Sequence, residues 1–346
     1  MPKNKLSLQL NVDDFLPASD AEKEGLTVMR QSVGFWKDGL RRLKKNKIAM
    51  ISLVVIILVM ILSFIVPQFY PYSYEQQIKG SENLAPMEYS ETELAAIEAG
   101  ESVFPHILGT DNLGRDYAIR VMMGSRVSLV VGLVASCIIL IIGSLYGSIA
   151  GFFGGWVDLI MMRIVDMIYT VPDILIIILL SVSINEPLKA LAQKPGFEWI
   201  QVVGVNLISI FIVFALLYWV GMSRIVRSQI LILKEQEYVT AARALGASSS
   251  HIIRKHLLTN CIGTLIVTTT LQIPSSIFTE SFLSFLGMGV AAPMPSLGSL
   301  ASDALNGLYS YPHRLFAPAL AISIIILSFN LLGDGLRDAF DPKLKD

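Results

Sequence analysis

Six long apolar stretches, separated by polar segments, account for most of the 346-residue chain. The first covers residues 48–66 and carries no charged side chain. The other five cover residues 127–150, 160–184, 200–222, 262–278 and 315–332. An α-helix of about 20 predominantly apolar residues crosses the hydrocarbon core of a bilayer. The pattern therefore predicts an all-α integral membrane protein with six transmembrane helices.

Glycine and proline change the expected shape of three of these helices. The second stretch ends in GSLYGSIAGFFGG, whose small residues allow a neighbouring helix to approach closely. Pro172 in the third stretch and Pro274 in the fifth remove a backbone donor, so a kink is predicted at each. A kinked helix can flex beside a transport pathway or can simply be a packing feature, and both interpretations stay open.

Lysine and arginine placement predicts the orientation of the chain. A basic cluster precedes the first apolar stretch, at Arg41, Arg42, Lys44, Lys45 and Lys47. The segment between the fourth and fifth stretches and the C-terminal end are also basic. Basic loops stay on the cytoplasmic side, so six crossings place both termini in the cytoplasm. Arg115, Arg120 and Arg126 run against this trend, because they precede the second stretch on the outer side.

The same pattern divides the chain into regions. Residues 1–47 are predicted to form a cytoplasmic tail that ends in an interfacial helix near residues 33–43, and residues 48–66 the first transmembrane helix. Residues 67–126 form an acidic extracytoplasmic segment, in which SETELAAIEAG has the composition of a short helix with a serine cap. Residues 127–336 form a five-helix core that includes a cytoplasmic loop at 223–261. Residues 337–346 form a cytoplasmic tail.

Composition and motifs restrict the chemistry. Hydrophobic residues make up 53% of the chain and charged residues only 16%, against about 25% charged in an ordinary soluble domain. A net charge of -1 gives no indication of a nucleic-acid partner. The two cysteines lie in apolar surroundings and the four histidines are scattered, so no metal site is expected. The phosphate-binding pattern G-x-x-x-x-G-K-[ST] is absent, so the chain is not expected to hydrolyse ATP or to hold a cofactor.

The polar stretch EYVTAARALGASSSHIIRKHLLTN, residues 237–260, predicts two helices joined by a tight turn. Gly246 suits the position just past a helix end, where the backbone turns left-handed. One of the three serines at 248–250 can cap the second helix. Ala241 and Ala242 keep the first helix slim, so the protruding turn can enter a groove on a partner protein.

Charged residues in or beside the apolar stretches are the remaining candidates for a functional role. Asp158, Arg163 and Asp166 lie near the cytoplasmic end of the third stretch, where Arg163 and Asp166 can pair on one helix face. They form either a gate or substrate contact, or a structural pair that involves the C-terminal tail. Glu280 and Asp303 are expected at the outer interface, where solvent or a docking protein satisfies them.

The polar stretch and five further segments resemble one family. TAARALG followed by IIRKHLLTN resembles the cytoplasmic Glu-Ala-Ala loop of ABC importer permeases, with Thr240 in place of Glu and Thr259 in place of a common Pro. Residues 106–116, 124–129, 154–172, 280–300 and 329–344 resemble signatures of peptide permeases, in the same order. The chain is thus similar to the C-type membrane subunit of dipeptide and oligopeptide importers, a group that also includes nickel and glutathione permeases.

The resemblance implies a type I (MetI-like) permease core with an extra N-terminal helix, in the cell membrane of a bacterium. It implies a non-enzymatic subunit that pairs with a homologous permease, two ATPase subunits that bind ATP and Mg, and an extracellular binding protein. Its coupling loop would use Glu237, Tyr238, Ala241, Ala242, Arg243, Gly246 and Ala247. The substrate would be an oligopeptide or dipeptide, with a nickel chelate or glutathione as the alternative.

Two other classes of protein are alternatives to an importer permease. A secondary transporter driven by an ion gradient commonly has buried acidic residues at mid-membrane and inverted repeats. The sequence shows sparse charge at these positions and no internal repeat. An intramembrane enzyme needs a nucleophile and base, or metal ligands, at membrane depth, and no such set is evident.

Overall fold

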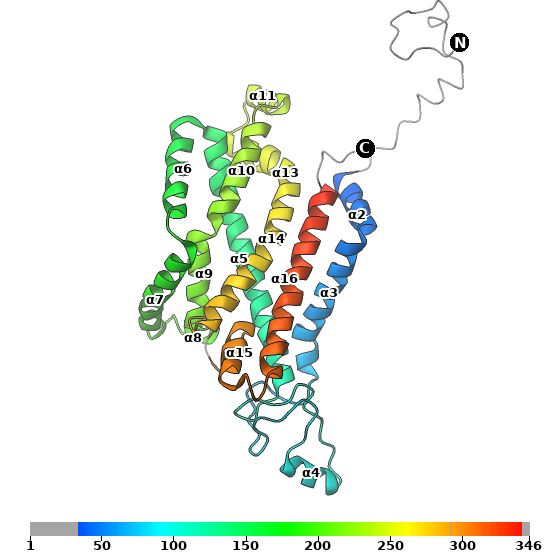
Figure 1. Cartoon of the computed structure of the whole chain (residues 1–346). Coiled ribbons are helices and arrows are strands. Elements are labelled where there is room, and N and C mark those ends of the chain that lie inside the picture. Colours follow the sequence, from blue (N-terminus) through cyan, green and yellow to red (C-terminus); the bar gives the residue numbers. More distant parts are fainter. Residues whose placement is uncertain (1–33, 291, 341–346) are drawn as a thin grey trace, which may run out of the picture.

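A computed structural model describes residues 34–290 and 292–340. Within these residues the chain is helical, and its only β-type pairing is one isolated bridge between Thr110 and Asp116. The helices run side by side in a bundle (Figure 1). The turn around α11 lies at one end of this bundle, and an irregular segment that contains α4 lies at the other end.

The N-terminal part of the described chain consists of two consecutive helices. The amphipathic helix α2 (Phe35–Lys45) matches the predicted interfacial helix, and it buries Gly39 and Leu43 against α16. Asn46 then caps α3 (Lys47–Phe64) by accepting a hydrogen bond from the Ala49 N–H at 3.1 Å. The short turn η2 (Val66–Gln68) follows. The predicted tail before α2 lies outside the described residues.

The central helix α5 (Tyr117–Phe153) is 37 residues long and begins ten residues before the predicted start at 127. Asp116 fixes this start, because its carboxylate accepts a hydrogen bond from the Ile119 N–H at 3.0 Å. The boundary predicted at 126/127 was therefore wrong. Arg120 and Arg126 belong to the helix and not to the loop before it.

The third apolar stretch forms two helices instead of one kinked helix. Helix α6 (Gly155–Tyr169) ends before Pro172, and α7 (Asp173–Ala192) begins after it. Proline donates no backbone hydrogen bond and disfavours helical backbone at the residue before it, which explains the break. Figure 1 shows α6 in the half of the bundle that carries α11, and α7 in the other half.

The fourth apolar stretch also contains a joint. The short helix α8 (Trp199–Val203) leads into α9 (Val205–Leu217), and α10 (Trp219–Leu233) continues the direction of α9 beyond Tyr218. Helix α10 extends 11 residues past the predicted end at 222. Consequently Arg224 and Arg227, which were predicted to lie in a loop, are on a helix.

The remaining elements complete the bundle. After α11 (Glu237–Ala244) come α12 (Ser249–His251), the π-helical turn η3 (Ile252–Leu257), α13 (Leu258–Asn260) and α14 (Ile262–Phe285). Helix α15 (Leu297–Ala304) and the turn η4 (Leu305–Gly307) precede α16 (His313–Phe340). Helix α16 continues past the tail boundary predicted at 336/337, and residues 341–346 lie outside the description. Helix α4 (Glu91–Glu98) is the predicted short helix with its serine cap, Ser90.

Six helical stretches in the described chain are long and apolar enough to cross a membrane, which confirms the predicted number. They are Lys47–Gln68, Tyr117–Phe153, Asp173–Ala192, Val205–Leu233, Ile262–Phe285 and His313–Phe340. Helix α5 contacts the helices of four others, α3, α9–α10, α14 and α16. The buried core therefore follows α5 along the bundle.

Candidate functional site

The turn after α11 has the left-handed backbone that was predicted at Gly246. Gly246 has φ +82°, in the left-handed region. The Ala247 N–H donates to the Ala242 carbonyl at 3.0 Å, and the Gly246 N–H donates to the Arg243 carbonyl at 2.9 Å. This pair of bonds is the Schellman motif, which satisfies the last carbonyls of a helix. The second arm begins at Ser248, whose hydroxyl accepts from the His251 N–H at 3.4 Å.

A buried cluster joins this hairpin (residues 237–260) to the bundle. Val239 is completely buried and packs with Ile252 and Leu257 of the second arm. The same cluster contains Ile139 and Phe152 of α5 and three residues of α10: Met222, Val226 and Ile230. The Lys234 ammonium also donates to the Gly151 carbonyl of α5 at 3.0 Å. The hairpin is thus attached by its inner face to both α5 and α10.

The seven predicted coupling residues divide into an outer and an inner group. Glu237, Tyr238, Ala241, Arg243 and Gly246 are exposed. Ala242 and Ala247 are half-buried and pack against the cluster around Val239. The Arg243 guanidinium also lies 5.0 Å from the centre of the Phe152 ring. Leu245, which the sequence argument did not single out, is the most prominent apolar side chain of the turn, with 88% of its surface exposed.

The three charged candidates of the third apolar stretch are paired differently from the prediction. Asp158 accepts two hydrogen bonds from Arg227 of α10, from Nε and Nη2, both at 2.5 Å. Asp166 accepts from Arg224 Nη2 at 2.8 Å, and the Arg224 guanidinium lies over the Tyr169 ring. The predicted Arg163–Asp166 pair does not form, and Arg163 is exposed. The predicted involvement of the C-terminal tail was also wrong, because α10 supplies both partners.

Glu280 lies inside the protein, contrary to its predicted position at the outer interface. Its carboxyl group is fully buried within α14. The Ser128 hydroxyl of α5 and the Ser284 hydroxyl donate to it at 2.7 Å each, and Ser281 lies within 3.4 Å. Glu280 therefore links α5 to α14. Asp303, the other residue of that prediction, is exposed on α15.

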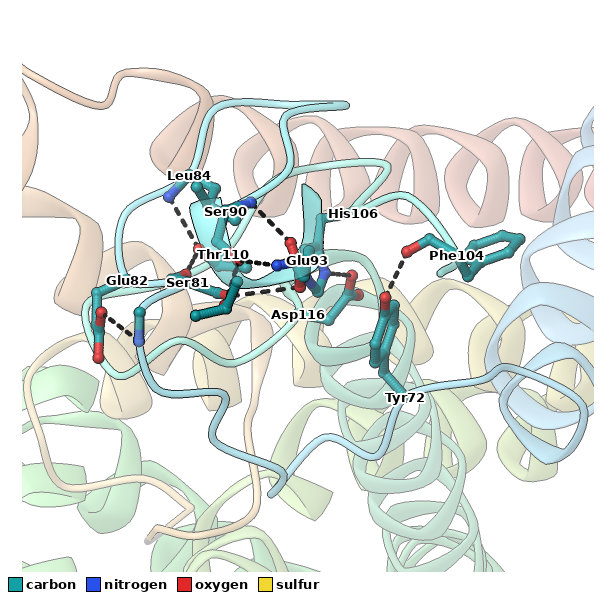
Figure 2. A network of polar contacts seen from close by, with 12 residues as sticks. Tyr72, Ser81, Glu82, Leu84, Ser90, Glu93, Phe104, His106, Thr110 and Asp116 are labelled. Atoms are coloured by element: carbon teal, nitrogen blue, oxygen red, sulfur yellow. Dashed lines mark hydrogen bonds and ion pairs between the residues drawn. The ribbon is translucent and has the colours of Figure 1, made fainter. Parts of the chain in front are cut away.

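The outer segment contains a polar network that the sequence argument missed (Figure 2). His106 is completely buried, with Nδ1 2.7 Å from Asp116 and Nε2 3.0 Å from Glu93. Its ring stacks on Tyr72 at 4.5 Å. Burial alone would lower the pKa of His106, but the hydrogen bonds to Asp116 and Glu93 outweigh burial and hold this pKa above its usual value. Since Asp116 also caps α5, the network fixes the outer segment on the bundle.

The chain is similar to permeases over nearly its full length. The family described as binding-protein-dependent transport system inner membrane component matches residues 143–346, and the N-terminal TM domain of oligopeptide transport permease C matches residues 34–86. The oligopeptide transport system permease protein OppC of Bacillus subtilis is 42% identical, over 95% of each chain. The dipeptide transport system permease protein DppC of the same organism is 40% identical, over 96% of this chain and 93% of the relative.

A glutathione transport system permease protein, GsiD of Pectobacterium atrosepticum, is 32% identical over 90% of this chain and 92% of the relative. These matches agree with the six apolar helices and with the order of the sequence signatures. The chain belongs to the family of binding-protein-dependent transport system inner membrane components, which are the multi-pass permeases of ABC importers.

Proposed function

We propose that the chain is the transmembrane permease subunit of an ATP-driven importer for oligopeptides or dipeptides. The observation that carries the substrate class is the 40–42% identity to an oligopeptide and a dipeptide permease over at least 93% of each chain. Glutathione is the second candidate, since a glutathione permease is 32% identical. A binding protein delivers the substrate, and a homologous second permease completes the pathway.

The proposed orientation places the hairpin in the cytoplasm together with both termini. The basic residues before α3 and around α11 support this orientation through the positive-inside rule. The irregular segment with α4 then lies on the outer face, where the binding protein arrives. The chain holds no ATP or Mg of its own, and two ATPase subunits bind both.

In the proposed mechanism the exposed turn of the hairpin enters a cleft on an ATPase subunit. Glu237, Tyr238, Ala241 and Leu245 face outward and supply a slim surface with one apolar tip. When the ATPases close on ATP, the hairpin moves with them. Because Val239 fixes its inner face on α5 and α10, this movement turns the bundle. Each nucleotide state then favours either the inward-open or the outward-open permease.

The ion pairs between α6 and α10 have a structural role in this proposal. Asp158–Arg227 and Asp166–Arg224 hold the half-helix α6 against α10, so both move as one body. Beyond the break at Pro172, α7 packs against α9. The pathway itself is proposed to be a water-filled cavity with few specific side-chain contacts, because peptides differ in their side chains. A peptide-bound structure with a tight, side-chain-specific pocket in this chain would contradict that statement.

The test of the proposed function compares two substitutions at Gly246 in the reconstituted complex. A Cβ added at Gly246 meets no described atom within 4 Å apart from its own chain neighbours, but the left-handed φ strains any residue other than glycine. Gly246→Ala and Gly246→Trp share this strain and differ only in bulk. We expect Gly246→Ala to retain the ATPase subunits on purification and to import labelled peptide, and Gly246→Trp to lose both.

A matched control lies at the opposite end of the bundle. Gly100 has φ +91° and also has open space around it, so Gly100→Trp adds the same strain and bulk away from the hairpin. This variant is expected to retain the ATPase subunits. The coupling role is wrong if Gly246→Trp assembles and imports peptide like the wild type. The substrate class is wrong if the wild-type complex hydrolyses ATP but imports neither dipeptides nor oligopeptides.

A further inference from the structure

A polar cavity of about 270 Å³ lies where α5, α15 and α16 begin or end next to the outer segment. It is separate from the hairpin, because α15 and the start of α16 lie at the opposite end of the bundle from α11 (Figure 1). Its walls carry Arg120 and Arg314, the carboxylates of Asp111 and Asp303, and the Tyr311 ring. Two buried cations in one small cavity raise the question of what neutralises them.

Arg314 is 7% exposed and forms no ion pair with any described carboxylate. Its Nη2 donates to Asn83 Oδ1 at 2.7 Å and to the Thr110 carbonyl at 2.8 Å, and its guanidinium lies 4.5 Å from the centre of the Tyr311 ring. Its Nε is buried and donates to no acceptor. Buried charges in proteins are normally paired, because an isolated one is costly.

Arg120 is also incompletely satisfied. It is 4% exposed, and among the described residues it forms one ion pair, which joins Nη1 to Asp111 Oδ2 at 3.0 Å. Nε has no hydrogen-bond partner among the described residues, and Nη1 contacts Asp111 at ion-pair distance without forming a hydrogen bond. Asp111 already accepts from Arg115 Nε at 2.7 Å. A single carboxylate thus serves two guanidinium groups.

The second carboxylate of the cavity, Asp303, pairs with neither buried arginine. Asp303 forms no ion pair or hydrogen bond among the described residues. Although part of Asp303 is exposed, desolvation raises its pKa, the nearby Arg115 charge opposes this rise, and Asp111 adds to it. The cavity lining thus carries two arginines and two aspartates, but the buried N–H groups that lack acceptors belong to Arg120 and Arg314.

We propose that this cavity binds a carboxylate, presented by an acidic side chain of the substrate-binding protein when that protein docks. Guanidinium forks match the geometry of a carboxylate and bind it with paired hydrogen bonds. The volume suits one side chain and not an extended peptide. Beside the cavity, Tyr309 is completely exposed and Leu305 is 47% exposed, which provides an aromatic and apolar rim for a protein partner. This inference rests on the proposed function.

The test measures docking directly. The complete complex is reconstituted in lipid nanodiscs, and the Kd of its fluorescently labelled binding protein is measured with substrate-loaded protein. Arg314→Gln and Arg120→Gln are each expected to raise this Kd by at least about tenfold, because each removes a buried charge that pairs with the incoming carboxylate. The matched control is Arg126→Gln, which removes an exposed charge from α5 outside the cavity. It is expected to change Kd by less than about twofold.

If an arginine variant fails to assemble, a substitution that changes the charge of the cavity in the opposite direction still tests the proposal. Asp303→Asn removes a negative charge from the same wall, and it is expected to lower the Kd several-fold. A site that binds a carboxylate must bind it more tightly when a neighbouring negative charge is removed. If Asp303→Asn weakens docking instead, the cavity attracts a cation and the proposal is wrong. It is equally wrong if all three variants dock like the wild type.

The source of the carboxylate is tested with the substrate. Peptides with a free C-terminus and the same peptides with a C-terminal amide are compared for import by wild type and Arg120→Gln. If docking is unchanged and the defect appears only with the free C-terminus, the cavity serves the substrate and the docking proposal is overturned. Failure of the wild-type complex to import any peptide tests the proposed function alone, because binding-protein docking is measured separately.

Discussion

Glu280 is the residue whose position differs most from its prediction. Its carboxyl group lies among serine hydroxyls between α5 and α14, fully buried. We expect Glu280→Ala to lower the stability of the purified protein by about 2–4 kcal/mol, because the Ser128 and Ser284 hydroxyls lose their acceptor and a void forms. Glu280→Gln keeps an acceptor oxygen and the volume, so its loss is expected to be smaller. Thermal unfolding in detergent provides the measurement.

The control for Glu280 is a carboxylate on the surface of the same protein. Glu186 pairs with Lys189 on the surface of α7, with 77% of its side chain exposed. Exposed pairs contribute little, so Glu186→Ala is expected to leave the unfolding temperature nearly unchanged. If Glu280→Ala is as harmless as this control, the serine cage around Glu280 does not stabilise the bundle.

The residues that were predicted correctly have roles that are set by residues close to them in the sequence. Gly246 and a serine cap among residues 248–250 were predicted because a helix end and a helix start are set by residues within one turn, and the structure identifies the cap as Ser248. Glu280 was misplaced because its partner Ser128 lies 152 positions away in the chain. For the same reason the sequence paired Arg163 with Asp166, three positions apart, although Arg224 is the partner of Asp166. Long-range partners need the packing of the bundle, which no local pattern specifies.

At the scale of elements, the close contact between α5 and α10 depends on glycines. Gly143, Gly147 and Gly151 lie along one face of α5, and a Cβ at Gly147 would lie 2.3 Å from the Ser223 carbonyl oxygen of α10. We expect Gly147→Leu to separate the two helices and to abolish a stable, monodisperse protein, because backbone cannot yield as a flexible side chain does. Size-exclusion profiles and thermal unfolding check this expectation.

A glycine of α10 itself serves as the control for this contact. A Cβ at Gly221 meets no atom within 4 Å. Gly221→Leu is therefore expected to give a folded protein with an unfolding temperature close to that of the wild type. Comparable damage from both leucines would mean that glycine flexibility, and not close approach, explains the α5 pattern.

The outer segment is expected to lose stability as pH rises above about 6.5, the ordinary pKa of histidine. His106 has a raised pKa in the folded chain, so its contribution is complete below its ordinary pKa of about 6.5 and is lost as pH rises through the folded value. Burial would raise the pKa of Glu93, but hydrogen bonds from Ser90 and His106 lower it below its usual range. The Glu93 contribution is therefore lost only in acid. Hydrogen exchange of residues 72–116 at pH 6 and pH 8 measures this change.

The comparison for this pH effect is His106→Gln in the intact chain. Glutamine carries no titrating proton, so the difference between pH 6 and pH 8 is expected to shrink although overall protection falls. Helix α16 in the same sample provides an internal reference for the intrinsic effect of pH on exchange. Equal pH dependence in wild type and variant would show that His106 does not control the stability of this segment.

The elements themselves were predicted unevenly for identifiable reasons. The number of membrane-spanning stretches was correct because long apolar runs without charge have few other stable arrangements. The start of α5 was misplaced because charged residues such as Arg120 and Arg126 are typical of a loop. The structure shows that Asp111 pairs with Arg120 and that the Arg126 guanidinium lies over the Phe64 ring. Pro172 was recognised as a disturbance, but the sequence does not distinguish a kink from a complete break.

At the scale of the whole molecule, the cluster around Val239 decides whether the hairpin moves with the bundle or independently of it. This cluster joins α11 and the second arm of the hairpin to α5 and α10. The ion pairs of Asp158 and Asp166 extend the same body to α6. In the proposed mechanism, a force on the exposed turn is therefore distributed over α5, α6 and α10. The half-helix α7 lies beyond the break at Pro172 and packs elsewhere, because its Ile177 belongs to a second buried cluster with residues of α5 and α9.

Val239→Ala tests whether transport depends on this rigid attachment. The substitution removes buried methyl groups and is expected to loosen the hairpin by about 1–3 kcal/mol without altering its exposed face. ATPase subunits should then still bind and hydrolyse ATP, but fewer peptides should be imported per ATP hydrolysed. The neighbouring exposed Thr240→Ala is the control and should leave this ratio unchanged. If Val239→Ala retains the wild-type ratio, the movement reaches the bundle by a route other than the buried cluster, and α14, which follows the hairpin directly in the chain, becomes the next element to test.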